Sequence, residues 1–586
     1  MDADRLIIAN CSGFFGDRFS AAEEMVNGGD IDVLTGDYLA ELTMAILFQQ
    51  KMKKPEAGYV GTFLKQMKAV MRQCLERNIK VVSNAGGLNP RGMAKALADL
   101  ANELGLSPKI AWIEGDDLMP RLKELQAAGA PLSHLDKGGD LSACGGMPVS
   151  ANAYLGGWGI TAALREGADI VVCGRVADAA LISGPCAWHF NWAENDWDRL
   201  AGAYAAGHVI ECGAQATGGN YSFMEEVPDY VNIGFPLAVV YPDGSSVITK
   251  HAGTGGLVSV GTVTAQLMYE IRTPTYLTPD VRVRFDTLKL TQEGDNRVRL
   301  SGVRGEPAPE TTKVCLNIMS GYRNAMTVVL TGLDIEKKAA IVEETLWRKL
   351  GGKDRFGRVN VQLIRSDKQN PTTNEEAFAY LKVTVMDADP AKVGRSFSSA
   401  LVEMALASIP GFTMTHPPDR ESPVITHWPA LIANRHITQT VHLNDHTITI
   451  GPVSSPSPAV PVQAVSVELP AVPAGPTRAV PLGRLFASRS GDKGGNANLG
   501  VWAKSPAAFA FLRQFLTVDR LRDLLPDVRG CEVERYELAN LLAVNFYIQG
   551  LLGDGAAASW RSDPQAKTLG EYLRAKVIDV PASLLS

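Results

Sequence analysis

Residues 169–178 read DIVVCGRVAD, a short apolar run that ends abruptly in glycine, arginine and aspartate. Four more runs in the first 180 residues follow the same pattern: LIIANCSGFFGD at 6–17, IDVLTGDY at 31–38, KVVSNAGGLNP at 80–90 and KIAWIEGDD at 109–117. Apolar runs of this length, separated by helix-like segments, are typical of buried parallel strands. We therefore predict an α/β domain with a mainly parallel sheet over residues 1–205.

The predicted secondary structure changes after residue 205, from alternating strands and helices to segments richer in strands. A Pro-Asp-Gly turn within residues 235–250 predicts a hairpin, and residues 312–410 alternate strand pairs with helices. We expect a β-rich and α+β region over residues 206–450. Residues 451–481 repeat proline, serine, alanine and valine, which is typical of an extended linker. Residues 482–586 then predict a small two-layer α+β domain.

Composition excludes several classes of protein. The net charge of −6 and the absence of a basic run argue against nucleic acid as a partner, and no apolar stretch reaches the roughly 20 residues of a membrane span. The N-terminus lacks a signal-peptide pattern, so we expect a cytoplasmic protein, and its size favours a homo-oligomer. Eight scattered cysteines without a CxxC pair argue against zinc or iron–sulfur binding. The first strand is followed by no GxGxxG fingerprint, which argues against NAD.

The polar residues that end the five runs predict a site, because ligands of parallel sheets bind beyond the carboxyl ends of the strands. Carboxylates brought together there can act as general acids or bases. We expect catalytic roles for Asp17, Asp37, Arg175 and Asp178, with Asn84 and Glu211 binding substrate. Two alternatives stay open for these residues: oxygen ligation of Mg²⁺, and helix N-capping, which we favour for Asp116 and Asp117.

Two glycine-rich turns could hold an anionic part of a substrate. In KHAGTGG (residues 250–256), consecutive backbone amides would form an anion nest, with Lys250 adding positive charge. In SRSGDKGGNANLGVW (residues 488–502), arginine and lysine lie among flexible glycines. The alternatives are a plain turn and a salt-bridged interdomain contact. The substrate-binding candidates from these motifs are Lys250, Thr254, Gly255, Gly256, Arg489, Asp492, Lys493 and Asn496.

Taken together, these motifs resemble the acyclic terpene utilisation AtuA-like family. The resemblance rests on IANCSGFFGD, TGDYLAELTM, SNAGGLNP, ANAYLGGWGI, GADIVVCGRVADAAL, ECGAQATGG, KHAGTGGLV and SRSGDKGGNANLGV, and it covers about residues 5–445 and 480–580. It implies a ferredoxin-like fold, without a cluster, for the C-terminal region. It also implies a place in bacterial degradation of citronellol- and geraniol-type terpenes, whose intermediates are coenzyme A thioesters. The resemblance carries over no catalytic residues.

Our leading hypothesis is a lyase or hydratase that acts on a branched acyl-CoA or a related small-molecule carboxylate. Asp37 or Asp178 would move the proton next to the carbonyl, and Arg175 or the GTGG turn would stabilise the enolate. Coenzyme A is the substrate carrier in this view, and no resident cofactor is firmly implied. The second hypothesis is a Mg²⁺-dependent enzyme on a phosphorylated or carboxylate substrate, with Asp17, Asp37 and Asp178 as ligands. The third is a non-catalytic subunit or ligand-binding module of a catabolic complex.

Overall fold

The computed structural model describes residues 2–453 and 462–585. Within these ranges the largest sheet has eleven strands, in the order β11-β12-β8-β7-β1-β2-β3-β6-β4-β19-β20. Its five central strands run parallel and are the five predicted ones: β1 (Leu6–Asn10), β2 (Val33–Gly36), β3 (Lys80–Ser83), β6 (Ile170–Cys173) and β4 (Ile110–Glu114). Antiparallel strands extend both edges, so the α/β prediction is confirmed while the sheet as a whole is mixed: β7 (Pro236–Val240), β8 (Ser246–Lys250), β11 (Lys289–Gly294), β12 (Arg297–Ser301), β19 (Gln439–Leu443) and β20 (His446–Ile450).

Helices cover both faces of the parallel strands, which explains why the strands are apolar throughout. Successive residues of a strand point to opposite faces. Val172 packs with α1 (Ala21–Asn27), α3 (Gly61–Glu76) and α4 (Pro90–Glu103). Val171 packs on the other face, among residues of three further helices: α6 (Trp158–Arg165), α7 (Ala180–His189) and α8 (Trp197–Ile210). None of the helices in the described residues is long and apolar enough to cross a membrane.

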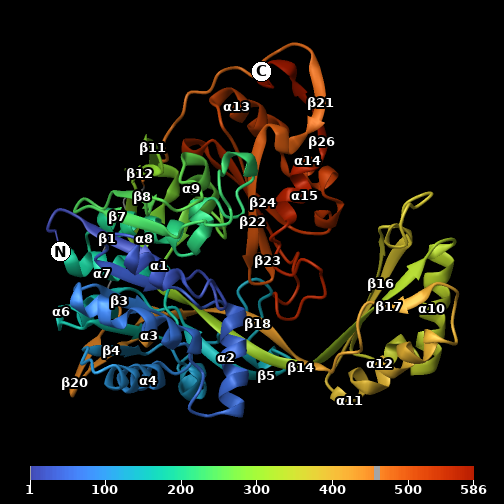
Figure 1. Ribbon diagram of the computed structural model, residues 1–586, viewed down its shortest axis with the longest axis horizontal. Helices are drawn as coiled ribbons and strands as arrows, with labels where there is room; N and C mark the ends of the chain where they lie inside the picture. The colour runs from blue at the N-terminus through green and yellow to red at the C-terminus, as the bar shows by residue number, and fades with distance from the viewer. Residues whose placement is uncertain (1, 454–461, 586) are drawn as a thin grey trace.

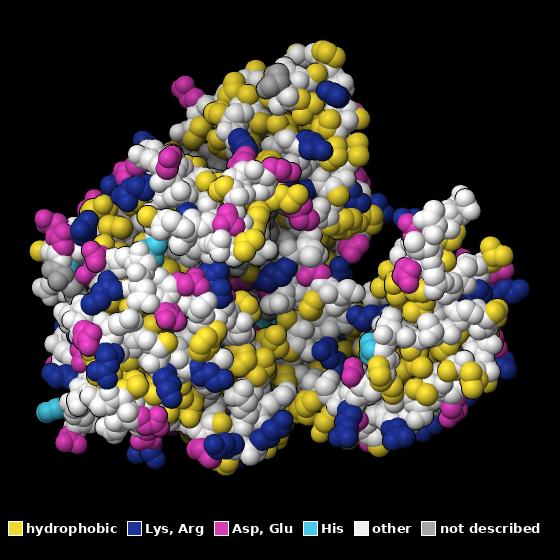
Figure 2. All heavy atoms as spheres, viewed as in Figure 1, with side chains coloured by type: hydrophobic (Ala, Val, Ile, Leu, Met, Phe, Trp, Pro, Cys, Tyr) yellow, Lys and Arg dark blue, Asp and Glu magenta, His cyan; other side chains and the backbone are white. Residues whose placement is uncertain are grey.

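One very long strand joins the main body to an outer lobe. Strand β14 (Thr311–Thr331) pairs with β5 (Met147–Ala153) and β18 (Ser422–Ala433) beside the main sheet, and with β16 (Phe378–Asp387) in the lobe. Figure 1 shows the strand running from the main body into the lobe, and Figure 2 shows a notch between the lobe and the C-terminal tail. The other elements of the lobe are α10 (Ile335–Leu350), β15 (Arg358–Arg365), α11 (Pro390–Val393), α12 (Arg395–Val402) and β17 (Phe412–Met414).

The tail forms the predicted small α+β unit. Its sheet has the order β22 (Phe486–Lys493), β23 (Asn496–Ala503), β25 (Ala543–Ile548) and β24 (Val533–Leu538). Three helices accompany it: α13 (Pro506–Phe515), α14 (Val518–Leu524) and α15 (Leu569–Arg574). Part of the predicted linker, residues 454–461, lies outside the described residues. The rest of that segment ends in β21 (Thr477–Pro481), which pairs with β26 (Val577–Pro581).

Two buried asparagines fasten the tail sheet to the main body. The amide of Asn498 donates to the carbonyl of Met268 at 2.8 Å, and its oxygen accepts from the backbone N–H of Glu270 at 2.8 Å. Asn545 donates to the carbonyls of Ile271 and Arg272 at 3.2 and 2.9 Å. These contacts follow α9 (Val260–Leu267) and fix the face of the tail that lies against the main body.

Replacing Asn498 with alanine should loosen this attachment. Each buried backbone group that loses its partner costs about 1–3 kcal/mol. We expect N498A to have a lower thermal midpoint and faster amide hydrogen exchange in residues 268–272. The control is Q514A on the exposed surface of α13, which should leave both quantities unchanged. If amide hydrogen exchange of residues 268–272 were as slow in N498A as in the wild type, Asn498 would not hold the tail against the main body.

Candidate active site

The first element of the site is the turn between β2 and α2 (Glu41–Lys53). Asp37 lies there with its carboxyl group buried, and Asn84, which follows β3, donates its amide to Asp37 Oδ1 at 2.5 Å. The amide oxygen of Asn84 also accepts from the backbone N–H of Tyr38 at 2.9 Å. Burial, followed by the nearby carboxylates of Asp178 and Glu211, raises the pKa of Asp37 well above its ordinary value. The surroundings of Asp37 therefore favour its protonated form.

Arg175 lies below this turn and is almost completely buried, with 2% of its surface exposed. Its guanidinium donates to Asp178 Oδ1 at 2.5 Å and to the carbonyl of Leu39 at 3.3 Å. The same group stacks 4.1 Å from the ring centre of Tyr154. Asp178 is more accessible, with 27% of its side chain exposed. The buried guanidinium of Arg175 thus holds the carboxyl group of Asp178, which is partly exposed at the site.

Asp116 differs from the capping role expected for it. Its Oδ2 atom accepts from the amide of Asn152 and from the backbone N–H of Arg175, both at 2.8 Å. Burial raises the pKa of Asp116 to about 7. Its neighbour Asp117 does accept from the backbone N–H of Met119 at 3.0 Å, as a local cap would. Asp116 instead holds the backbone from which Arg175 projects.

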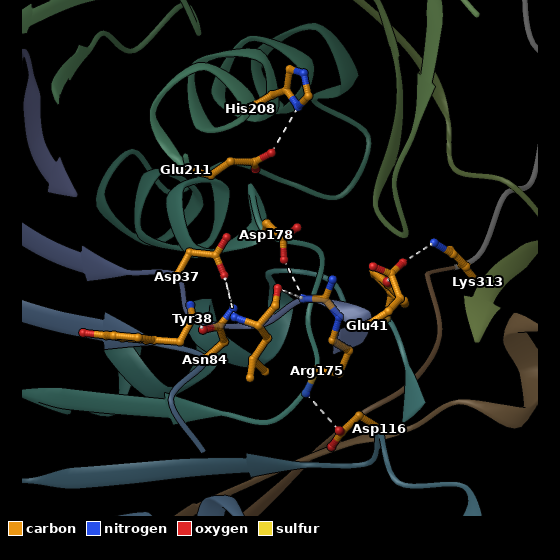
Figure 3. Close-up of polar contacts among 12 residues, drawn as sticks. Asp37, Tyr38, Glu41, Asn84, Asp116, Arg175, Asp178, His208, Glu211 and Lys313 are labelled. Carbon is orange, nitrogen blue, oxygen red and sulfur yellow. Dashed lines mark hydrogen bonds and ion pairs between the residues drawn. The ribbon is translucent and has the colours of Figure 1, made fainter. Parts of the chain in front are cut away.

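A third carboxyl group, from Glu211 at the end of α8, lies across from Asp37 and Asp178. Figure 3 shows the three groups around one space, with His208 behind Glu211. Burial and the carboxylate of Asp178 raise the pKa of Glu211 well above its ordinary value, while burial lowers the pKa of His208 to about 4. His208 Nδ1 lies 3.1 Å from Glu211 Oε1. Glu211 Oε2 is buried and has no partner in the described residues.

The tail of the same chain brings positive charge to these carboxyl groups. Lys493 ends β22 and opposes the raised pKa of Glu211, and burial lowers the pKa of Lys493 itself. Its ammonium makes no hydrogen bond or ion pair with the residues described here, and it lies 5.9 Å from the ring centre of Tyr276. Lys567 contacts Glu270 at 3.0 Å and Asp492 at 3.1 Å. The predicted tail motif therefore meets the strand-end site.

A second charged cluster lies beside the first. Glu41 begins α2 and accepts from Lys313 at 3.0 Å, and His427 Nε2 is 3.8 Å from it. Burial would raise the pKa of Glu41, but Lys313 and His427 hold it well below its ordinary value. Glu41 and His427 line an opening together with Asp492 of the tail. Sequence patterns did not single out Glu41, Lys313, His427, Glu270 or Lys567, because only tertiary contacts bring them here.

Other predicted site residues already make hydrogen bonds to neighbouring groups of the fold. Both oxygens of Asp17 accept backbone N–H groups, from Gly13 at 2.8 Å and Arg18 at 2.7 Å. The amide of Asn496 donates to the Tyr547 hydroxyl at 2.6 Å, and its oxygen accepts from the backbone N–H of Gly550 at 2.8 Å.

The polar groups of the GTGG turn also make hydrogen bonds within the fold. The ammonium of Lys250 donates to the carbonyl of Thr254 at 2.6 Å. The amides of Gly255 and Gly256 donate to the carbonyls of Asn232 and Asp229, both at 2.8 Å. These two amides are therefore not available to the predicted anion nest.

The Mg²⁺ hypothesis does not fit these side chains. The carboxylate of Asp17 is taken by the turn that contains it, so it does not join Asp37 and Asp178 as a third ligand. In residues 2–453 and 462–585, no group of three or more His, Cys, Asp or Glu side chains is arranged to hold a metal ion. We derive no step through a metal.

The raised pKa of Asp116 predicts a pH effect on stability. Between its ordinary value of 3.8 and about 7, the folded protein binds a proton that the unfolded chain has released. The contribution of Asp116 to stability is therefore full below about pH 4 and falls as the pH rises to about 7. The asparagine of D116N stays neutral at every pH. The thermal midpoint of D116N minus that of the wild type should therefore increase from pH 5 to pH 8. The matched control is D99N, on the exposed surface of α4, whose difference from the wild type should stay flat. A flat difference for D116N would contradict the assignment.

Comparison with known proteins places this geometry in a family. A model of the acyclic terpene utilisation family protein AtuA matches residues 6–443, and a model of the AtuA ferredoxin-like domain matches residues 480–579. No curated protein matches the sequence. A crystal structure of S. aureus homoserine dehydrogenase is similar at 11% identity over 70% of this chain and 84% of that chain, but its TM-score of 0.13 supports no argument. The two family matches take in both the strand-end carboxyl groups and the tail lysines that face them, and the chain belongs to the acyclic terpene utilisation AtuA family.

Proposed function

We propose that the chain is a lyase or hydratase that acts on a branched acyl-CoA, or a related carboxylate, in the use of acyclic terpenes. One observation carries the proposal: three carboxyl groups surround one space, and only one of them has an arginine partner. Pairs of titratable groups whose surroundings push their pKa values apart mark an acid and a base. The exposed part of Asp178 and the unpartnered Glu211 Oε2 favour catalysis over a sealed structural network.

Asp178 is the base in this proposal. Its carboxyl group pairs with the buried guanidinium of Arg175, and its partial exposure lets it reach a substrate carbon next to a carbonyl. The sequence led us to consider Arg175 as the group that stabilises the enolate. Its guanidinium is instead engaged by Asp178, Leu39 and Tyr154, so we assign it a positioning role.

Asp37 is the acid, with Glu211 as a second protonated group beside it. Both have raised pKa values because they are buried near other carboxylates. In a dehydration, Asp178 takes the proton from the α carbon, and the electron pair of the broken C–H bond moves toward the carbonyl oxygen to give the enolate. This pair then returns to form the new carbon–carbon double bond. The bond from the β carbon to its hydroxyl breaks, and the proton of Asp37 leaves with that hydroxyl as water. Proton exchange with solvent then restores both carboxyl groups.

Lys493 stabilises the enolate oxygen. A fixed cation aimed at the position where negative charge develops lowers the barrier of such a step. The ammonium is free of recorded partners within the described residues and acts electrostatically on both Glu211 and Asp178. The tail is thus a part of the catalytic site in this proposal.

Replacing either carboxyl group with an amide should abolish most turnover, because an amide can neither accept nor give the proton. We expect D178N and D37N each to lower kcat by about 10²–10⁴-fold, the usual contribution of a positioned acid or base. The assay follows hydration of 3-methylcrotonyl-CoA by loss of the enoyl-thioester absorbance. D30N, on a fully exposed carboxylate, is the control and should keep wild-type kcat. Turnover within a few-fold of wild type in both D178N and D37N would refute the assignment.

Removing the ammonium of Lys493 should lower kcat more than it changes KM. K493M loses a charge that acts mainly as the enolate forms, whereas K493R keeps a cation and should recover part of the rate. Loss of the cation also removes an influence that lowers the pKa of Glu211, so the alkaline limb of the pH–rate profile should move to higher pH in K493M. An effect confined to KM would show that Lys493 only binds the ground state.

A further inference from the structure

Arg489 is a buried cation for which the described residues provide no counter-ion. It lies on β22, and 6% of its surface is exposed. Its Nε is sealed from solvent without a partner, and no hydrogen bond or ion pair joins its guanidinium to the described residues. The terminal nitrogens also lack a partner in the described residues, but they are not fully sealed from solvent. An arginine in this state is ready to bind an anion.

The neighbouring acids are committed elsewhere. Glu270 and Asp492 both contact Lys567, at 3.0 and 3.1 Å, and that ammonium also donates to the hydroxyl oxygen of Tyr269. Removing a charge from water without a partner is strongly unfavourable. The absence of a protein counter-ion therefore indicates that an outside anion completes the site.

The local structure orients the guanidinium. It stacks 4.3 Å from the ring centre of Tyr269, which leaves the edge that carries its terminal nitrogens available. Gly491, two residues along the strand, allows this ring to approach: a Cβ atom there would lie 2.5 Å from Tyr269. The glycine of the tail motif thus makes room for the platform beneath Arg489.

Arg489 and Lys493 share one face of β22, since residues two apart on a strand point the same way. Four residues of extended strand at 3.3 Å each separate them by about 13 Å. We propose that Arg489 binds a phosphate group of the substrate carrier while Lys493 faces the reacting thioester; this inference rests on the proposed function. The thiol-terminated arm of coenzyme A is long enough to span this distance, and a guanidinium fork matches a phosphate.

The test measures binding of coenzyme A and of inorganic pyrophosphate to the full-length protein. Wild type should bind coenzyme A and show a raised thermal midpoint, and pyrophosphate, but not acetate, should compete. R489M should raise the dissociation constant at least tenfold. Without ligand, R489M should be at least as stable as wild type, because an unpaired buried charge has been removed. R520M is the matched control: Arg520 also stacks on an aromatic ring of the tail, 4.8 Å from Phe515, but is exposed.

Two results would overturn the inference. Equal affinity for coenzyme A in wild type and R489M would show that Arg489 does not touch the carrier. A lower thermal midpoint of ligand-free R489M, with acetate rather than pyrophosphate competing, would show a structural arginine beside a carboxylate site. D178N separates this inference from the proposed reaction, since it should lose turnover and still bind coenzyme A as wild type does.

Discussion

The ion pair between Arg175 and Asp178 is the contact on which the site depends. A buried charge pair is destabilising when its remaining polar atoms lack partners. Here Asp116 holds the backbone of Arg175, the carbonyl of Leu39 accepts from the guanidinium, and Tyr154 covers its face, while the Nε atom is buried without a partner in the described residues. Strand β6 carries this arginine between β3 and β4, so the centre of the sheet fixes the pair. Burial, and next the carboxylate of Asp178, raise the pKa values of Asp37 and Glu211.

The main body and the tail supply opposite charges to one space. The strand ends provide Asp37, Asp178 and Glu211, while the tail provides Lys493 and Lys567. The buried asparagines Asn498 and Asn545 set the register between the two parts, because each bonds backbone atoms of residues 268–272. Such amides tolerate few alternative dockings.

The sequence predicted the five parallel strands and several residues that meet at their ends, because apolar runs and their polar stops are local signals. It could not distinguish Asp116 in a buried network from Asp117 in a local cap, since both follow the same strand. The sequence also predicted an anion nest in the GTGG turn, but the amides of Gly255 and Gly256 donate to carbonyls more than 20 residues earlier in the chain. Glu41 and Lys313 meet only because β14 pairs with β5, and such long-range pairing leaves no local pattern.

The excess of carboxyl groups is compatible with an anionic substrate for an electrostatic reason. If Asp37 and Glu211 were both ionised beside Asp178, they would repel a thioester that carries phosphates. Their raised pKa values reduce that repulsion and, in the proposed dehydration, favour the protonated acid that a leaving hydroxyl needs. An arriving negative charge would raise these pKa values further. Substrate binding and protonation of the acid therefore reinforce each other, and the unpaired cations of the tail offset what negative charge remains.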